Sequence, residues 1–343
     1  MNSLRFFDAT LRDGSHANKH QFSQTDISNY CKLIDTAGMD VVFVGHGNGL
    51  GASSLQVGLS KIPDQDMLDT ARRNLRRTKL GAYMIPGFGT IKDNIEPAIE
   101  CGVDVFKIGC QCTEADITRQ HIEYIRSRGK DVYGVLMMYH MTSTERLLEE
   151  AQKMQGYGAS GIILMDSAGA STPELVKKTI STLRKGLRVE IGFHAHNNLG
   201  LAVSNTYTAI QEGATIIDGT IRGFGAGAGN CPLEVIVALL KKEGYSLNGI
   251  DWYKMLDASD GIASKFLTTD KGIDSISVVS GVAGVFSAFK TQVMKAAEEF
   301  GIDGRDIFME LGERKVMAGQ EDMIIDVAEE LKKRRVSNDV FSF

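Results

Sequence analysis

Short runs of apolar and β-branched residues alternate with longer amphipathic segments up to about residue 262. Eight of these runs predict strands, at residues 5–12, 40–46, 79–87, 104–111, 131–139, 161–167, 188–196 and 215–223. The intervening segments predict helices, most clearly at residues 24–38, 113–129, 144–158 and 171–186. Several of them begin with Ser or Thr followed by an acid or Gln and end on Gly, as capped helices do.

Strands that alternate with helices in this number are typical of an α/β fold, the (β/α)8 or TIM barrel. A doubly wound sheet is the alternative, but it usually has a Gly-rich phosphate turn after its first strand, and TLRDGSH at residues 10–16 does not match one. Beyond residue 262 the pattern is helical, most clearly at residues 287–301 and 321–335. The sequence therefore predicts a barrel domain over residues 1–262 and a helical C-terminal extension over 263–343.

The composition excludes several classes of protein. The chain has 343 residues, of which 43% are hydrophobic and 24% charged, values ordinary for a globular protein. A net charge of −5 gives no electrostatic footprint for nucleic acid or an anionic membrane, and no apolar run is long enough to span a bilayer. The N-terminus lacks the features of a signal peptide, and the five cysteines contain no C-x-x-C pair. We therefore expect a protein of the reducing cytoplasm.

Two histidines separated by one residue end the seventh predicted strand. His194 and His196 would point to the same face there, at the C-terminal mouth where barrel enzymes build their sites. Asp13, just past the first predicted strand, can add a carboxylate from across that mouth. Two imidazoles and a carboxylate suit a divalent metal ion, and mixed nitrogen and oxygen ligands favour Mn²⁺ or Mg²⁺ over Zn²⁺. The alternative is two hydrogen-bonded polar residues in a loop.

Arg12 and His16 flank this carboxylate in the sequence. An arginine at the mouth can hold the carboxylate of an α-keto acid and polarise its keto oxygen, although a structural salt bridge is the alternative role for Arg12. His16 is a candidate general acid or base. Together these residues predict chemistry on an oxo acid.

The chain resembles the 4-hydroxy-2-oxovalerate aldolases, which belong to the HMG-CoA lyase-like superfamily of metallolyases together with isopropylmalate and homocitrate synthases. The similarity runs from about residue 4 to residue 331, and after the first-strand Arg-Asp-Gly the chain has Ser15 and His16, as the aldolases do. It is carried by six motifs: DATLRDGSHANKHQ, GHGNGLGASS, CTEADITRQHIEY, HAHNNLGLAVSN, GAGAGNCPLEV and AGQEDMIIDVA.

The resemblance implies a class II aldolase that cleaves a 4-hydroxy-2-oxo acid to pyruvate and an aldehyde. It implies that Arg12 binds substrate and stabilises the pyruvate enolate, while His16 takes the proton of the C4 hydroxyl. The other residues expected at the site are Asp13, His194 and His196 as metal ligands, Asn230 as a support of the metal shell, and Ser167, Tyr83 and Phe286 as substrate-binding residues.

The resemblance also implies a setting for the activity. The metal is expected to be Mn²⁺, with Mg²⁺ or Co²⁺ as alternatives, and the reaction is expected to serve aromatic hydrocarbon catabolism. An acylating aldehyde dehydrogenase is the expected partner, with the C-terminal extension forming part of that interface or of a homodimer.

The chain departs from the family pattern on the aldehyde side. Phe286 stands where a Tyr is usual, Tyr83 where a Leu is usual, Tyr139 where a Ser is usual and Arg222 where a small residue is usual. One interpretation is that Tyr83 returns a hydroxyl lost at Phe286. Another is that Arg222 and Lys107 face a polar or anionic aldehyde portion, with both residues facing outward as the alternative.

Two other functions stay open at this point. One is an acyl-CoA-dependent Claisen synthase of the same superfamily, which Ser15 and His16 disfavour. The other is a non-catalytic partner subunit, which would have no need of the complete set of candidate site residues.

Overall fold

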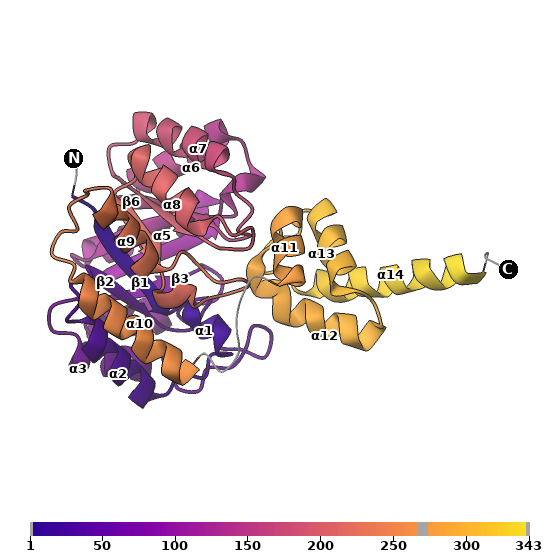
Figure 1. Ribbon diagram of the computed structural model, residues 1–343, viewed down its shortest axis with the longest axis horizontal. Coiled ribbons are helices and arrows are strands. Elements are labelled where there is room, and N and C mark those ends of the chain that lie inside the picture. The colour runs from indigo at the N-terminus through magenta and orange to yellow at the C-terminus, as the bar shows by residue number, and fades with distance from the viewer. Residues whose placement is uncertain (1–2, 267–273, 341–343) are drawn as a thin grey trace.

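The computed structural model describes residues 3–266 and 274–340. Parallel strands close a barrel in chain order, with β1 pairing to β8 (Figure 1). The strands are β1 (Arg5–Leu11), β2 (Val41–Val44), β3 (Lys79–Met84), β4 (Val105–Gln111), β5 (Asp131–Met137), β6 (Gly161–Asp166), β7 (Glu190–Ala195) and β8 (Ile216–Gly219). The predicted TIM barrel is confirmed, and every strand lies within its predicted range.

Helices follow the strands and cover the outside of the barrel. Three of the helix starts expected from the sequence are capped by side chains, because Ser23, Ser143 and Thr172 each accept a hydrogen bond from the backbone N–H three residues later. The helices of this part are α1 (Gly14–Ala17), α2 (Gln24–Ile34), α3 (Asp64–Asn74), α4 (Glu96–Glu100), α5 (Arg119–Ser127), α6 (Thr144–Gly156), α7 (Pro173–Gly186), α8 (Ala202–Gln211), α9 (Leu233–Lys242) and α10 (Trp252–Phe266).

The barrel has two apolar layers, one between the strands and the helices and one inside the ring of strands. The inner layer contains large side chains such as Phe7, Phe43 and Tyr133, so the interior is packed and is not a pore. A lysine, Lys107 of β4, also points into this interior and is fully buried.

The C-terminal helices form a second body beside the barrel mouth (Figure 1). They are α11 (Ser275–Ala283), α12 (Lys290–Phe300), α13 (Gly304–Glu313) and α14 (Asp322–Val340). They share an apolar cluster that also includes Met138 and Ala168 from loops of the barrel. The preceding α10 crosses the predicted boundary at residue 262 and packs on α2 and α9 of the barrel. The junction of the two bodies includes residues 267–273, which lie outside the described residues, so the predicted boundary stays a prediction.

Hydrogen bonds attach the second body to loops at the mouth of the barrel. The backbone N–H of Ser287 donates to the carbonyl of Ser167 at 3.1 Å, and its hydroxyl donates to Oδ1 of Asn198 at 3.0 Å. His140 Nε2 lies 3.2 Å from the carbonyl oxygen of Gly284. The extension is thereby held over the edge of the barrel at which the strands end. No helix within the described ranges is long and apolar enough to cross a membrane.

Candidate active site

Asp13, His194 and His196 converge at the mouth of the barrel, as the sequence predicted. His194 is in β7 and His196 follows its last residue, while Asp13 precedes the short helix α1. One potential ligand atom from each lies within 4.8 Å of the others, and all three residues are buried. The spacing of two residues on a strand explains why both imidazoles reach the same point.

The carboxylate of Asp13 is fixed by its neighbours. Its Oδ2 accepts hydrogen bonds from Asn230 Nδ2 at 2.5 Å and from the backbone N–H of Ala226 at 3.2 Å. Asn230 also forms a β-bridge with His196. The loop after β8 therefore contacts two of the three candidate ligands, and the role of Asn230 as a support of the metal shell stays a prediction.

These residues fit a divalent cation. Although burial acts to raise it, the Arg12 guanidinium and the nearby imidazoles hold the pKa of Asp13 well below its usual range. Burial lowers the pKa of His196 to about 4, so its ring is neutral at neutral pH. Both ring nitrogens of His194 and Nδ1 of His196 are buried without a hydrogen-bond partner among the described residues. A charged oxygen ligand and two imidazoles with unpartnered nitrogens form a set that a divalent metal ion would satisfy.

Arg12 lies beside the carboxylate with part of its donor capacity unused. Its Nη1 donates to Asp13 Oδ1 at 2.9 Å and to the carbonyl of Gly47 at 3.2 Å. The guanidinium carbon lies 4.7 Å from the centre of the Tyr83 ring. Nε and Nη2 are buried and have no partner within the described part of the chain. An anionic oxygen atom beside the metal ligands would satisfy them.

His16 lies near the candidate metal ligands, in a cluster of three imidazoles with His20 and His46. The rings of His20 and His46 stack at 3.7 Å between centroids, and the His16 ring is 5.0 Å from that of His20. Gly47 closes the other face of His16, where an added Cβ would overlap the ring. Burial lowers the pKa of His16 to about 4, so the side chain is neutral at neutral pH and able to accept a proton.

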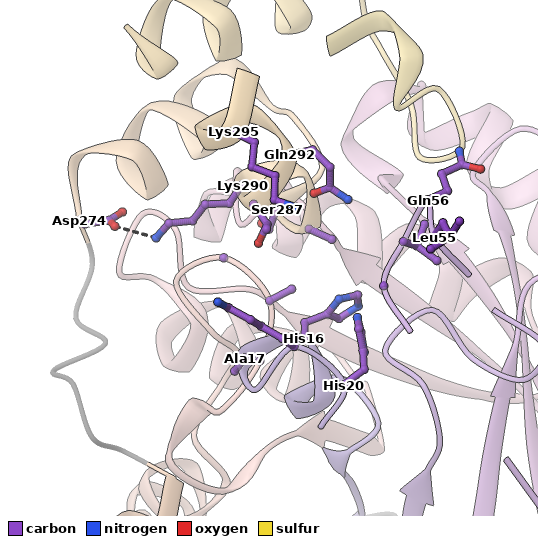
Figure 2. Close-up of a pocket in the computed structure, with 18 residues that line it drawn as sticks. His16, Ala17, His20, Leu55, Gln56, Asp274, Ser287, Lys290, Gln292 and Lys295 are labelled. Carbon is purple, nitrogen blue, oxygen red and sulfur yellow. Dashed lines mark hydrogen bonds and ion pairs between the residues drawn. The ribbon is translucent and has the colours of Figure 1, made fainter. Parts of the chain in front are cut away.

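A pocket of about 470 Å³ lies between this cluster and the C-terminal helices (Figure 2). His16 and His20 face it from the barrel side, and Ser287 and Lys295 face it from the other side. Ala226, which donates to Asp13, also lines it, so the pocket adjoins the candidate metal site. His16 therefore lines the pocket itself, whereas Asp13, His194 and His196 are not among its lining residues.

The other predicted substrate residues lie deeper than the pocket lining. The Ser167 hydroxyl accepts from the backbone N–H of Met138 at 3.3 Å, and the Tyr83 hydroxyl contacts Sδ of Met137 at 3.1 Å. Phe286 packs edge-on against Phe289 in the apolar cluster of the C-terminal helices. Their role in substrate binding stays a prediction.

The placement of two cations corrects the hypothesis of an anionic aldehyde portion. Lys107 does not reach the pocket, because its ammonium group is inside the barrel against the carboxylate of Asp218. Arg222 is exposed on a turn, where its backbone N–H binds the carboxylate of Glu234. Tyr139 is also buried away from the pocket, with its ring edge against Phe193.

Asp218, which no sequence motif singled out, connects this lysine to the candidate metal site. Oδ1 of Asp218 lies 3.2 Å from Nδ1 of His194. Burial acts to raise the pKa of Asp218, but Lys107 and His194 outweigh it and hold that pKa well below its usual range. The sequence does carry a signal for this pair, because the buried strands β4 and β8 each contain one charged residue. A charge in a buried strand requires a partner.

Known proteins match the chain along most of its length. Residues 3–262 match the HMGL-like family, and residues 271–333 match the DmpG-like communication domain. A 4-hydroxy-2-oxovalerate aldolase of Pectobacterium atrosepticum is 54% identical over 327 residues, which are 95% of each chain. The chain belongs to this aldolase family. A family member from Spirochaeta aurantia is 50% identical over 95% of this chain and 96% of its own. Membership makes the chain an enzyme, a carbon–carbon lyase.

Solved structures share the fold. The carboxyl transferase domain of Rhizobium etli pyruvate carboxylase with pyruvate matches with a TM-score of 0.79 and 15% identity, over 97% of this chain and 61% of that one. The HMG-CoA lyase of Bacillus subtilis matches with a TM-score of 0.66 and 19% identity, over 78% of this chain and 94% of that one. At these identities the likeness shows the fold alone.

Proposed function

We propose that the chain is a divalent-metal-dependent aldolase that cleaves a 4-hydroxy-2-oxo acid, such as 4-hydroxy-2-oxovalerate, to pyruvate and an aldehyde. The observation that supports this most strongly is the buried set of Asp13, His194 and His196 beside the unused donors of Arg12. The names of the relatives from Pectobacterium atrosepticum and Spirochaeta aurantia indicate the same substrate class.

The residues of the site divide the reaction between them. His16 takes the proton of the C4 hydroxyl, the C3–C4 bond breaks, and its electron pair passes to the C2 carbonyl to give the enolate of pyruvate. Arg12 donates hydrogen bonds to the oxygens of this enolate, and protonation at C3 completes pyruvate. A divalent ion held by Asp13, His194 and His196 would add electrostatic stabilisation of the negative charge on those oxygens. Asn230 keeps the Asp13 carboxylate in place.

We further propose Mn²⁺ as the metal, with Mg²⁺ or Co²⁺ as substitutes, because one carboxylate and two imidazoles suit these ions. The match of residues 271–333 to the DmpG-like communication domain supports an aldehyde dehydrogenase as the partner that takes up the aldehyde. The same helices are the proposed surface for a homodimer. We also propose that the protein acts in the cytoplasm, in the catabolism of aromatic hydrocarbons. The five cysteines form no disulfide, which is consistent with a reducing compartment.

The proposal is tested by pyruvate release from 4-hydroxy-2-oxopentanoate with and without Mn²⁺. The wild-type chain is compared with His194→Ala and with His121→Ala, a matched control on α5 away from the mouth. Release that requires the metal, is lost in His194→Ala and is kept in His121→Ala supports the proposal.

Exchange of the methyl protons of pyruvate with deuterium separates the two halves of the reaction. If pyruvate release is absent while the exchange proceeds, the enolate half operates and the proposed aldehyde is wrong. If the metal-loaded wild-type chain supports neither release nor exchange, the proposed activity is refuted.

A further inference from the structure

A lysine and an aspartate lie side by side inside the barrel, where charges are rare. Lys107 belongs to β4 and Asp218 to β8, on opposite sides of the ring of strands, and both side chains are 0% exposed. The Lys107 ammonium group binds Oδ2 of Asp218 and lies 3.6 Å from the centre of the Phe43 ring. A buried charge is costly unless it is paired, so each residue requires the other.

The aspartate also reaches the candidate metal site. The strand register places Asp218 of β8 opposite His194 of β7, and its Oδ1 lies 3.2 Å from Nδ1 of that imidazole. Neither atom has another hydrogen-bond partner among the described residues, and a small rotation of the ring would align this pair as a hydrogen bond. Lys107 and His194 therefore contact different oxygens of one carboxylate. A neutral histidine can bind a metal only through the nitrogen that carries no proton, and a carboxylate at the other nitrogen selects that form.

We propose that Lys107 and Asp218 are positioning residues that fix the ring orientation and the tautomer of His194 for metal binding. Asp218 supplies the acceptor for the Nδ1 proton, which leaves Nε2 free for the ion. Lys107 holds the carboxylate in place and compensates its charge, so that the acceptor is available inside an apolar barrel. The inference rests on the proposed metal site and names two residues that support it.

A merely structural role would predict something different. A buried ion pair can often be replaced by apolar side chains of similar size without loss of stability, because the pair gains little over its desolvation. If Lys107 and Asp218 serve only the packing of the barrel, any well-folded neutral replacement of both should bind the metal normally. The two roles are therefore separated by variants that remove both charges and differ only in the acceptor.

The experiment compares the double variants Lys107→Met/Asp218→Asn and Lys107→Met/Asp218→Leu. The asparagine variant keeps an oxygen near Nδ1 of His194, and the leucine variant keeps a similar volume without one. Mn²⁺ affinity is measured by titration calorimetry on the full chain, with folding checked by circular dichroism. The control is Lys79→Met/Asp131→Asn, which removes an ion pair of 3.2 Å between strands β3 and β5 on the exposed side of the barrel.

The control and the asparagine variant are expected to stay within a few-fold of wild-type affinity, and the leucine variant to lose about 10- to 100-fold. Equal affinities of the asparagine and leucine variants would overturn the inference. Should the leucine variant not fold, Lys107→Met/Asp218→Val removes the same acceptor with a smaller side chain and is judged by the same comparison. A wild-type chain that binds no divalent ion would refute the proposed metal site itself, which is a distinguishable result.

Discussion

Two glycines at the mouth of the barrel offer a way to damage the metal site and the general base separately. A Cβ added at Gly47 would meet the ring of His16, and one added at Gly225 would meet the carboxylate of Asp13. Neither has a positive φ, so an alanine at either position acts through its added methyl group and not through backbone strain. The same substitution therefore tests two parts of the proposed mechanism.

The size of each effect follows from the contacts. The new Cβ of Gly47→Ala would overlap Cδ2 and Nε2 of His16 and lie 2.6 Å from its Cε1, whereas ordinary contacts begin at 3.4 Å. The ring must therefore retreat by at least that difference. A misplacement of about 1 Å can cost about 100-fold in rate, so kcat for pyruvate release is expected to fall by about that factor. In Gly225→Ala the Cβ overlaps both Asp13 Oδ2 and Asn230 Nδ2, and Mn²⁺ affinity is expected to fall by about 10- to 100-fold.

Calorimetry with Mn²⁺ and initial rates at saturating metal separate the two outcomes. Gly47→Ala should bind the metal normally and retain the exchange of pyruvate protons, since that exchange does not need the C4 hydroxyl proton to be removed. Gly225→Ala should lose metal affinity and recover part of its rate at high Mn²⁺. Full turnover in Gly47→Ala, or loss of metal binding in both variants, would refute the assigned positions of base and metal.

Further predictions concern the residues around these glycines. Arg12→Lys should lower kcat/KM by about 10²- to 10³-fold in pyruvate release assays, because the ammonium group cannot supply the unpaired donors of the guanidinium. His16→Ala should lower release by about 10²- to 10⁴-fold while pyruvate proton exchange persists by nuclear magnetic resonance. Burial lowers the pKa of His20 and of His46 to about 3, below the ordinary value of 6.5, so the unfolded chain takes up protons first as the pH falls. The stability that these two residues contribute should therefore be complete only well above pH 6.5, and about 3 kcal/mol of it should be lost as the pH falls from 7.5 to 5.5. His20→Asn/His46→Asn should reduce that slope in urea unfolding.

The alternation of strands and helices was predictable because each element carries its own local signal. Each predicted strand contains the observed one, and most of the excess lies at the C-terminal ends, as in residues 138–139 after β5 and 220–223 after β8. The first residues of these excesses, Met138, Tyr139, Thr220 and Ile221, are apolar or β-branched and continue the strand pattern. Met138 nevertheless adopts a left-handed conformation that ends β5. In a barrel the chain must turn at that edge to build the mouth, so tertiary structure overrides the local pattern there.

The convergence of the candidate metal ligands was predictable for a different reason. Two histidines at a spacing of two on a strand must share a face, and the barrel count placed them at the mouth with Asp13. The Lys107–Asp218 pair gave no comparable signal, because its partners come from strands four apart in the ring and their contact depends on the width and the register of the closed barrel. A linear pattern shows that each charge needs a partner and does not show which one.

The departures on the aldehyde side are easier to interpret with the side chains in place. The Tyr83 hydroxyl contacts Met137 beneath the mouth and does not line the pocket, so its position gives no support to the idea that it replaces a hydroxyl at Phe286. The ring of Tyr83 instead covers one face of the Arg12 guanidinium. The part of the site proposed to bind the enolate is thus built from strand ends of the barrel. The wall that faces His16 across the pocket comes from the C-terminal helices (Figure 2). Because these helices are attached to the mouth loops through Ser287, a change in their position would alter the aldehyde end of the pocket and leave the metal ligands in place.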